Sequence, residues 1–318
     1  MKHLAWVLIA LITSTDFTTA LPLPPISDHD RQTRLQLLQH YPYTGEKFDI
    51  PTSGNCRETV VQLPVVNVDT HKVSTHAVPV YLPNVYEEVP AVLVVPSIMG
   101  VQITDRIVAT DLCVNGMAAI IADFFDASEV QNIPGWEEDD MKIRSAIHGL
   151  RTTIDFAQRL SRVDARRIGV LGVSMGGILG SLLVGIDTRV SAAVIAAGAG
   201  NLPAIMAHTT QETVSRVRER RMSYMRTTDA TIYEMELRKH QLFDPIHFAA
   251  QAHSTSIFMT LIEGDTTVPT ENQMELWRAF GTPSSQTMTG SHLESLVTLI
   301  MFYRQPLIDF LRAHLLMQ

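Results

Sequence analysis

Continuously apolar runs alternate with amphipathic stretches through the middle of the sequence. The runs Ala91–Val95 and Met117–Ala122 consist of apolar residues alone, which is typical of strands buried on both faces of a sheet. The stretches Ile103–Asn115 and Asp139–Leu160 are long enough for helices, and in the second the apolar residues recur at spacings of three and four. Strands that alternate with amphipathic helices predict an α/β fold with a mostly parallel sheet covered on both faces.

The same patterns predict the positions of further elements. Additional strands are expected at Thr59–Val68, His76–Leu82, Arg167–Leu171, Val190–Ala196 and Ser256–Ile262. Additional helices are expected at Arg31–His40, Gly177–Val184 and Leu307–Leu316. Residues 201–250 interrupt the alternation, because they are helical in pattern and longer than an ordinary connection between a strand and a helix. We interpret them as a helical cap inserted into the fold.

The N-terminal region predicts two segments ahead of the main domain. An apolar run from Leu4 to Ile12 leads into small residues that end at Ala20, the pattern of a secretory signal peptide over residues 1–20. The run is too short to span a bilayer, which takes about 20 apolar residues. Residues 21–58 are expected to form an N-terminal arm and residues 59–318 the main domain. The signal predicts a secreted or periplasmic protein with no stable membrane anchor after cleavage.

The composition excludes several classes of protein. Apolar residues make up 46% of the 318 positions and charged residues 18%, which favours a large core over a disordered chain. The 33 acidic against 25 basic residues give a net charge of −8, so nucleic acid is not an expected partner. The two cysteines, Cys56 and Cys113, are too few for a zinc-finger array, and whether they pair is left open. The histidines show no metal-ligand spacing, so no catalytic metal or cofactor is expected.

One short motif indicates a specific chemistry. Gly172-Val173-Ser174-Met175-Gly176 matches the pattern Gly-x-Ser-x-Gly, and it lies between an apolar strand and a helix of small residues. In that strand–turn–helix setting a nucleophilic serine is exposed at the end of a sheet. The glycines leave room at a sharp turn, and the Met175 N–H at the helix N-terminus can stabilise an oxyanion. A phosphate site is disfavoured, because the motif lacks the P-loop lysine and the dinucleotide spacing.

A serine nucleophile requires a base, and the base requires an orienting carboxylate. In hydrolases with this motif the acid and then the histidine follow the serine along the chain. His292, in a loop of small residues, is the expected base, because the other downstream histidine, His314, lies in the terminal helix pattern. Asp265, after the last predicted strand, is the expected acid. Glu263, within that strand, and Asp244, before a proline, are weaker alternatives.

These motifs resemble those of the α/β-hydrolase superfamily over roughly residues 60–316, and most closely its secreted dienelactone-hydrolase-like and esterase-type members. The matching segments are Gly172–Gly177, Gly264–Pro269 and Gly290–His292. The resemblance implies that the main domain is catalytic, with an eight-stranded sheet and a triad of Ser174, Asp265 and His292. Dienelactone hydrolases usually carry cysteine at the nucleophile, so Ser174 favours ester hydrolysis over that lactone activity.

The resemblance also implies a second oxyanion donor in the loop after an early strand. Here that loop is Pro96–Gly100, which lacks the His-Gly pair often found there. By position, Ile98 is expected to offer its backbone N–H together with that of Met175, and Met99 is the alternative. Because the donor is a main-chain group, its side chain can vary.

The sequence therefore predicts a serine hydrolase that cleaves a small-molecule carboxylic ester through an acyl-enzyme. A peptidase or thioesterase of the same superfamily would use the same residues, and a non-catalytic hydrolase-like binding module is a further alternative. The identity of the substrate and the oligomeric state do not follow from the sequence. A group of arginines in the cap is interpreted as a solvated helix face rather than as an anion site. These are Arg216, Arg218, Arg220, Arg221 and Arg226.

Overall fold

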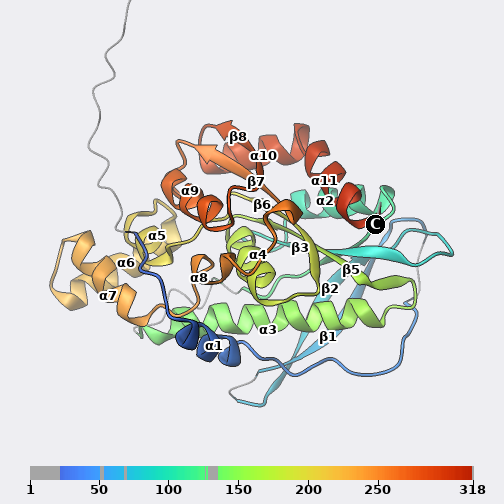
Figure 1. The fold of residues 1–318 in the computed structure, drawn as a ribbon, viewed down its shortest axis with the longest axis horizontal. Helices are drawn as coiled ribbons and strands as arrows, with labels where there is room; N and C mark the ends of the chain where they lie inside the picture. The colour runs from blue at the N-terminus through green and yellow to red at the C-terminus, as the bar shows by residue number, and fades with distance from the viewer. Residues whose placement is uncertain (1–21, 51–53, 68–69, 126, 128–134, 317–318) are drawn as a thin grey trace, which may run out of the picture.

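The computed structural model describes residues 22–316 apart from 51–53, 68–69, 126 and 128–134. The predicted signal peptide, residues 1–20, lies outside this part of the chain. Within it, eight strands form one sheet in the order β1-β2-β4-β3-β5-β6-β7-β8 (Figure 1). They are β1 Glu58–Val66, β2 Val73–Tyr81, β3 Val89–Val95, β4 Ala118–Ile121, β5 Val163–Val173, β6 Val190–Ala196, β7 Ile257–Glu263 and β8 Ser284–Thr289. The pairs β1–β2 and β2–β4 are antiparallel, and the other neighbours run parallel.

Helices cover both faces of the sheet. Hydrophobic residues of α3, α4 and α8 pack on one face, and those of α2, α10 and α11 pack on the other. The helices are α1 Asp28–Leu37, α2 Ile103–Val114, α3 Glu137–Arg159, α4 Met175–Ile186, α5 Leu202–His208, α6 Glu212–Met225, α7 Ala230–His240, α8 Ile246–Ala249, α9 Thr270–Ala279, α10 His292–Phe302 and α11 Gln305–Leu315. Helices α5, α6 and α7 contact one another and lie together at one end of the molecule (Figure 1). We call residues 201–250, which contain them, the cap.

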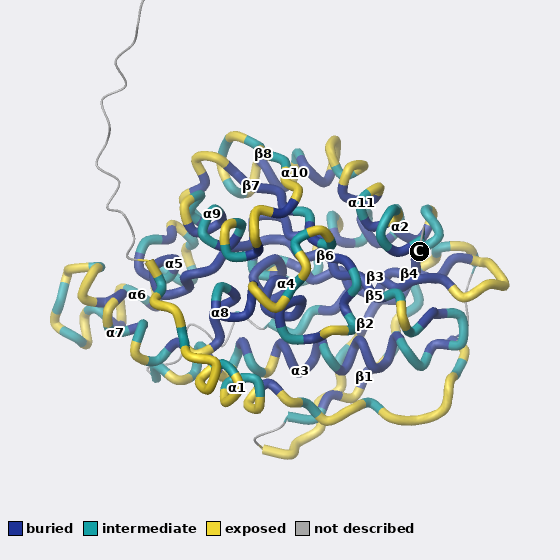
Figure 2. The backbone as a smooth tube through the Cα atoms, viewed as in Figure 1, coloured by how far each residue is buried: buried dark blue, intermediate teal, exposed yellow. Residues whose placement is uncertain are grey.

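The sheet has a hydrophobic core on each face, and these two cores explain why some strands are continuously apolar. In β3, Leu93 and Val95 belong to the core on one face, whereas Val92 and Val94 belong to the core on the other. Because successive side chains of a strand point to opposite faces, a strand covered on both faces has no position for a polar residue. Strands β3 and β4 are accordingly buried along their whole length (Figure 2).

Most elements lie within a few residues of their predicted positions, and the differences have physical reasons. The resemblance implied eight strands, but the apolar pattern located seven. The eighth, β8, is an edge strand rich in Ser and Thr whose residues are exposed or half-buried, so it lacks an apolar pattern. Helix α9 was not predicted either. Strand β5 begins at Val163 rather than Arg167, because Val163 pairs with Val89 across a bulge.

The N-terminal arm packs against the main domain through its helix and the residue that follows it. The Arg31 and Arg34 side chains donate hydrogen bonds to the carbonyls of His247 and Leu242. Leu38 is fully buried in the core beside α3, and its carbonyl accepts a hydrogen bond from Arg151. The two arginine contacts connect the arm to the part of the cap that follows α7, and the Leu38 contact connects it to α3. Among the described helices, none is long and apolar enough to cross a membrane.

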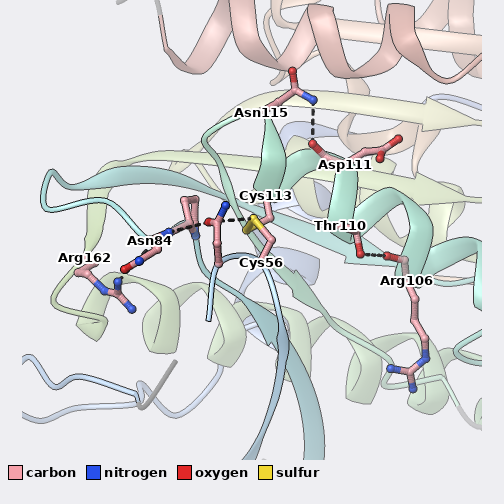
Figure 3. The surroundings of a disulfide bond; sticks show 10 residues. Cys56, Asn84, Arg106, Thr110, Asp111, Cys113, Asn115 and Arg162 are labelled. Carbon is pink, nitrogen blue, oxygen red and sulfur yellow. Dashed lines mark hydrogen bonds between the residues drawn. A yellow bond between two sulfur atoms is a disulfide. The ribbon is translucent and has the colours of Figure 1, made fainter. Parts of the chain in front are cut away.

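A disulfide joins Cys56, just before β1, to Cys113 near the end of α2 (Figure 3). The two Cα atoms are 5.5 Å apart, which is within the range that a disulfide allows. The pairing that the sequence left open is therefore present in the structure. It connects the edge hairpin of the sheet, β1–β2, to a helix that packs on the same sheet.

Reduction of this disulfide is expected to lower the free energy of unfolding by about 4 kcal/mol, because the unfolded chain is then free of a long closed loop. The cysteines are 57 positions apart. Urea unfolding of the protein with and without dithiothreitol measures the difference. The double variant Cys56→Ala/Cys113→Ala is the control, since reductant should not change its midpoint. A wild-type midpoint that is insensitive to reductant would contradict the prediction.

Candidate active site

The turn between β5 and α4 holds Ser174 in an unusual backbone conformation. Its φ is 55° and its ψ is −117°, and the residue is 6% exposed. Its N–H donates a hydrogen bond to the carbonyl of Ala196 in the neighbouring strand, at 2.8 Å. A Cβ at Gly172 would lie 2.2 Å from the Gly176 carbonyl oxygen, and one at Gly176 would lie 2.0 Å from the Val95 oxygen. Glycine is required at both positions, because helix and strands approach each other too closely for any side chain.

His292 lies opposite the serine, at the first residue of α10. Its Nε2 is 2.9 Å from the Ser174 Oγ, and its Nδ1 is 2.6 Å from Oδ2 of Asp265. When Nδ1 donates its proton to the carboxylate, Nε2 is left as an acceptor that faces the hydroxyl. The structure thus brings together the three side chains that the sequence singled out, from three separate connections after β5, β7 and β8.

The Asp265 carboxylate accepts hydrogen bonds from other groups in addition to His292. Its Oδ1 accepts hydrogen bonds from the backbone N–H groups of Thr267 and Val268, at 2.8 and 3.0 Å. Its Oδ2 accepts a further bond from the Gln273 side chain at 3.1 Å, and the carboxylate is buried. Gln273 also bonds to the backbone of Ile262 and Val268. Sequence analysis missed Gln273, because it lies on the unpredicted helix α9 and no local motif marks it.

The two alternative acids have other partners. Asp244 is fully buried and accepts hydrogen bonds from the N–H groups of Asn201, Leu202 and Ile246, so it fixes the start of α5. Burial raises the pKa of its carboxyl above the ordinary value. Glu263 is exposed at the end of β7, where its carboxylate lies 3.5 Å from the Thr289 hydroxyl. These contacts favour Asp265 as the partner of His292.

The two expected oxyanion donors, Met175 and Ile98, belong to segments that line the same cavity as the serine. Met175 is the first residue of α4, where backbone N–H groups lack partners within the helix. Ile98 lies in the loop after β3, and Ile98, Ser174 and Met175 line the same cavity. The N–H of Met99 donates instead to the Ser97 hydroxyl at 3.3 Å, and the Met99 side chain is exposed. These contacts favour Ile98 over Met99.

A cavity of about 100 Å³ opens at Ser174 and extends beneath the cap. We call it the cap cavity. Its lining is mostly apolar and comes from the main domain and from α5 and α6. Apolar lining residues include Phe125, Ile143, Ile178, Leu202, Ile205, Met206, Val214, Val217 and Val268.

A buried ion pair attaches the cap to the N-terminus of α3. Arg221, on α6, is 4% exposed and donates to both carboxylate oxygens of Asp139 and to the carbonyl of Gly135. Its guanidinium lies 5.0 Å from the centre of the Trp136 ring. The interpretation of the cap arginines as a solvated face is therefore wrong for Arg221, although Arg216 does pair with Glu212 at the surface. Sequence spacing along one helix cannot reveal a partner on another.

A second contact attaches the other end of the cap. The buried carboxyl of Asp140 accepts hydrogen bonds from the Gln241 side chain and from the N–H groups of Leu242 and Phe243. Burial, with a smaller contribution from the neighbouring Asp139, raises the pKa of this carboxyl to about 7 against the opposing effects of the backbone hydrogen bonds and Arg34. Over the described residues, no group of three or more His, Cys, Asp or Glu side chains could hold a metal ion.

The sequence model of the dienelactone hydrolase family matches residues 77–238, about half of the chain. The chain belongs to the dienelactone hydrolase family. Among curated proteins, no match was found. The protein is thus a hydrolase of the α/β-hydrolase fold, as the motifs and the alternation of strands and helices predicted.

Solved structures agree on the fold. Acetyl xylan esterase from Paenibacillus sp. R4 is similar with a TM-score of 0.64 and 16% identity, over 93% of this chain and 97% of that one. Acetyl xylan esterase 1 from Thermoanaerobacterium sp. JW/SL YS485 has a TM-score of 0.59 and 14% identity, over 90% and 95%. Pyrococcus horikoshii acylaminoacyl peptidase has a TM-score of 0.60 and 11% identity, over 84% of this chain but 43% of its own.

Replacing Gly176 by alanine is expected to lower the free energy of unfolding by about 3 kcal/mol or more, because β3 and α4 must separate to admit a Cβ. Gly135→Ala is the matched control, since its Cβ would meet only the Glu138 side chain, at 3.4 Å. Urea unfolding of both variants measures the difference. Equal stability of the two variants would show that the close approach of β3 and α4 is not required.

Asp140 is expected to make stability depend on pH. Because its folded-state pKa is raised to about 7, its contribution is full below about pH 4 and is lost as the pH rises through 7. Between pH 4 and 8 the unfolding free energy should therefore fall by up to about 4 kcal/mol more in the wild type than in Asp140→Asn. Urea unfolding across this range measures the difference, with Glu137→Gln as a control for net charge. Parallel profiles of the wild type and Asp140→Asn would refute the prediction.

Proposed function

We propose that the protein is a serine hydrolase that cleaves carboxylic esters, with Ser174, His292 and Asp265 as its catalytic triad. The observation that carries the proposal is the continuous set of hydrogen bonds from Ser174 Oγ through His292 to Asp265, at the mouth of an apolar cavity. Membership of a hydrolase family supports it. The acetyl xylan esterases named above share the fold.

The proposed reaction follows from the arrangement of these groups. His292 Nε2 takes the proton of the Ser174 hydroxyl as its oxygen attacks the ester carbonyl. The N–H groups of Met175 and Ile98 stabilise the oxyanion, and Asp265 orients the imidazole and stabilises its charged form. His292 then gives the proton to the leaving alcohol. A water molecule, deprotonated by the same histidine, releases the acid and restores Ser174.

We also propose that the protein acts outside the cytoplasm, as the signal-peptide pattern predicts. The disulfide between Cys56 and Cys113 supports this, because such bonds persist in oxidising compartments and are rare in the cytosol. Secretion from a native host, followed by N-terminal sequencing of the exported protein, tests the proposal. A mature chain that still begins at Met1 would overturn it.

Ser174→Ala is expected to lower kcat for p-nitrophenyl esters by at least about 10⁴-fold while the thermal melting temperature stays close to that of the wild type. A fluorophosphonate probe should label the wild type and not the variant, because only an activated serine reacts. Ser191→Ala, a replacement near the start of β6, is the control and should keep activity and labelling. Lack of labelling in the folded wild type would indicate a binding module, and faster turnover of amides or thioesters than of esters would also overturn the proposal.

Asp265→Asn is expected to lower kcat by about 10⁴-fold, because an amide no longer selects the histidine tautomer that accepts the serine proton. Glu263→Gln, two residues earlier at an exposed position, is the matched control and should keep nearly full activity. Initial rates with one ester at fixed pH compare the two variants. Similar losses in both would contradict the assignment of Asp265 as the acid.

A further inference from the structure

The ester hydrolysis proposed above leaves the substrate class open, and the cap cavity narrows it. We propose that this cavity binds the acyl group of the ester, and that the preferred acyl groups are hydrophobic chains several carbons long rather than acetyl. The proposal rests on the proposed function and concerns the same site.

The lining of the cap cavity favours an apolar occupant. Ile178 and Ile143 contribute from the main domain, and Leu202, Ile205 and Val217 from the cap helices. Burying each further methylene of a substrate against such side chains contributes up to about a fourfold gain in an equilibrium constant.

The polar residues that line the cavity already have partners in the protein. The Asp139 carboxylate is paired with Arg221, and the Gln241 side chain donates to Asp140. The Thr209 hydroxyl donates to the carbonyl of Thr267, and Gln211 accepts from the N–H of Val214. Lys142 likewise interacts with another group of the protein. A charged or hydroxylated acyl group would lose its water here and find these partners engaged, which disfavours it.

A second hollow shares the lining residues Ile98 and Phe125 with the cap cavity, and it differs in character. It has a volume of about 470 Å³, is more open to solvent, and is lined by polar as well as apolar residues, among them His76 and Asp123. We call it the outer hollow. Ile98 and Phe125 line both spaces, and Ser174 lines the cap cavity. On this proposal, one group of the ester lies in the cap cavity and the other toward the outer hollow.

The sequence of the reaction steps indicates which group of the ester occupies each space. The alcohol leaves first and must reach solvent before a water molecule takes its place, whereas the acyl group stays bonded to Ser174 until the second step. The open outer hollow suits the departing alcohol and the entering water. The more enclosed cap cavity suits the group that is retained.

The size of the cavity gives the expected chain length. One water molecule needs about 10–15 Å³, so a cavity of about 100 Å³ accommodates several heavy atoms. An acetyl group would leave most of it unfilled. We expect kcat/KM to rise from acetate to about hexanoate, by two- to fourfold per methylene, and then to level off.

The experiment uses the full chain and p-nitrophenyl esters from acetate to dodecanoate. Met206→Trp, on α5, fills the cap cavity and should lower the hexanoate-to-acetate ratio of kcat/KM at least about tenfold while acetate is still hydrolysed. Val214→Ala, on α6, enlarges the cavity and should move the optimum to longer chains. Met235→Trp is the matched control, because Met235 is an exposed residue of α7 outside the cavity. Its chain-length profile should equal that of the wild type.

A second series fixes the acyl group as acetyl and varies the alcohol from methyl to hexyl. Met206→Trp should not alter the relative rates within this series, because only the acyl group is expected in the cap cavity. A dependence on the alcohol instead of the acyl chain would overturn the assignment of the two groups. A wild type that prefers acetate, or a ratio that neither cavity variant alters, would overturn the inference while the proposed function stands. No hydrolysis of any ester, together with no fluorophosphonate labelling, would overturn the proposed function itself. Melting temperatures show whether the variants are folded. If Met206→Trp does not fold, the chain-length profile of Val214→Ala tests the acyl-site proposal.

Discussion

The backbone conformation of Ser174 is the constraint on which the rest of the site depends. A positive φ at a residue with a side chain costs about 1–3 kcal/mol, and it persists only where the surrounding structure allows no alternative. Here the surroundings are the central strands of a sheet that is buried on both faces. The Ser174 N–H is bonded to β6, and α4 approaches β3 so closely that only hydrogen fits at Gly176. The sheet therefore fixes the direction of the serine side chain. His292 lies within hydrogen-bonding distance of the Ser174 hydroxyl, and Asp265 within hydrogen-bonding distance of His292.

Much of the sheet and of the candidate site could be predicted from the sequence, because burial on two faces leaves a continuous run of apolar residues along a strand. The apolar runs at β3 and β4 and the glycines around Ser174 are such patterns, and the order of the three site residues completes the prediction. Strand β8 could not be found in this way, since it lies at the edge of the sheet, is rich in serine and threonine, and contains no fully buried residue. Gln273 and the pair of Arg221 with Asp139 were missed for a different reason. Each depends on a partner far away in the chain, and no local spacing encodes that contact.

The cap and the main domain meet through charged groups as well as through apolar packing. Asp139 and Asp140, adjacent at the start of α3, bind different parts of the cap, one through an arginine side chain and the other mainly through backbone N–H groups. The Asp139 carboxylate lies in the first turn of the helix, where the helix dipole stabilises a negative charge. One turn of helix therefore positions both α6 and the segment after α7. Because Asp139 and Gln241 also line the cap cavity, the same turn influences the shape of the space next to Ser174.

The bond between Cys56 and Cys113 has a consequence for how the protein withstands proteolysis. Strands β1, β2 and β3 and most of α2 lie between the two cysteines, and β1 is the exposed edge of the sheet. A protease that cuts the backbone once anywhere in this interval leaves two pieces that remain covalently joined. The cut ends stay beside the strands and helices with which they pack, so a nicked molecule can keep its sheet and its site together until the disulfide itself is reduced.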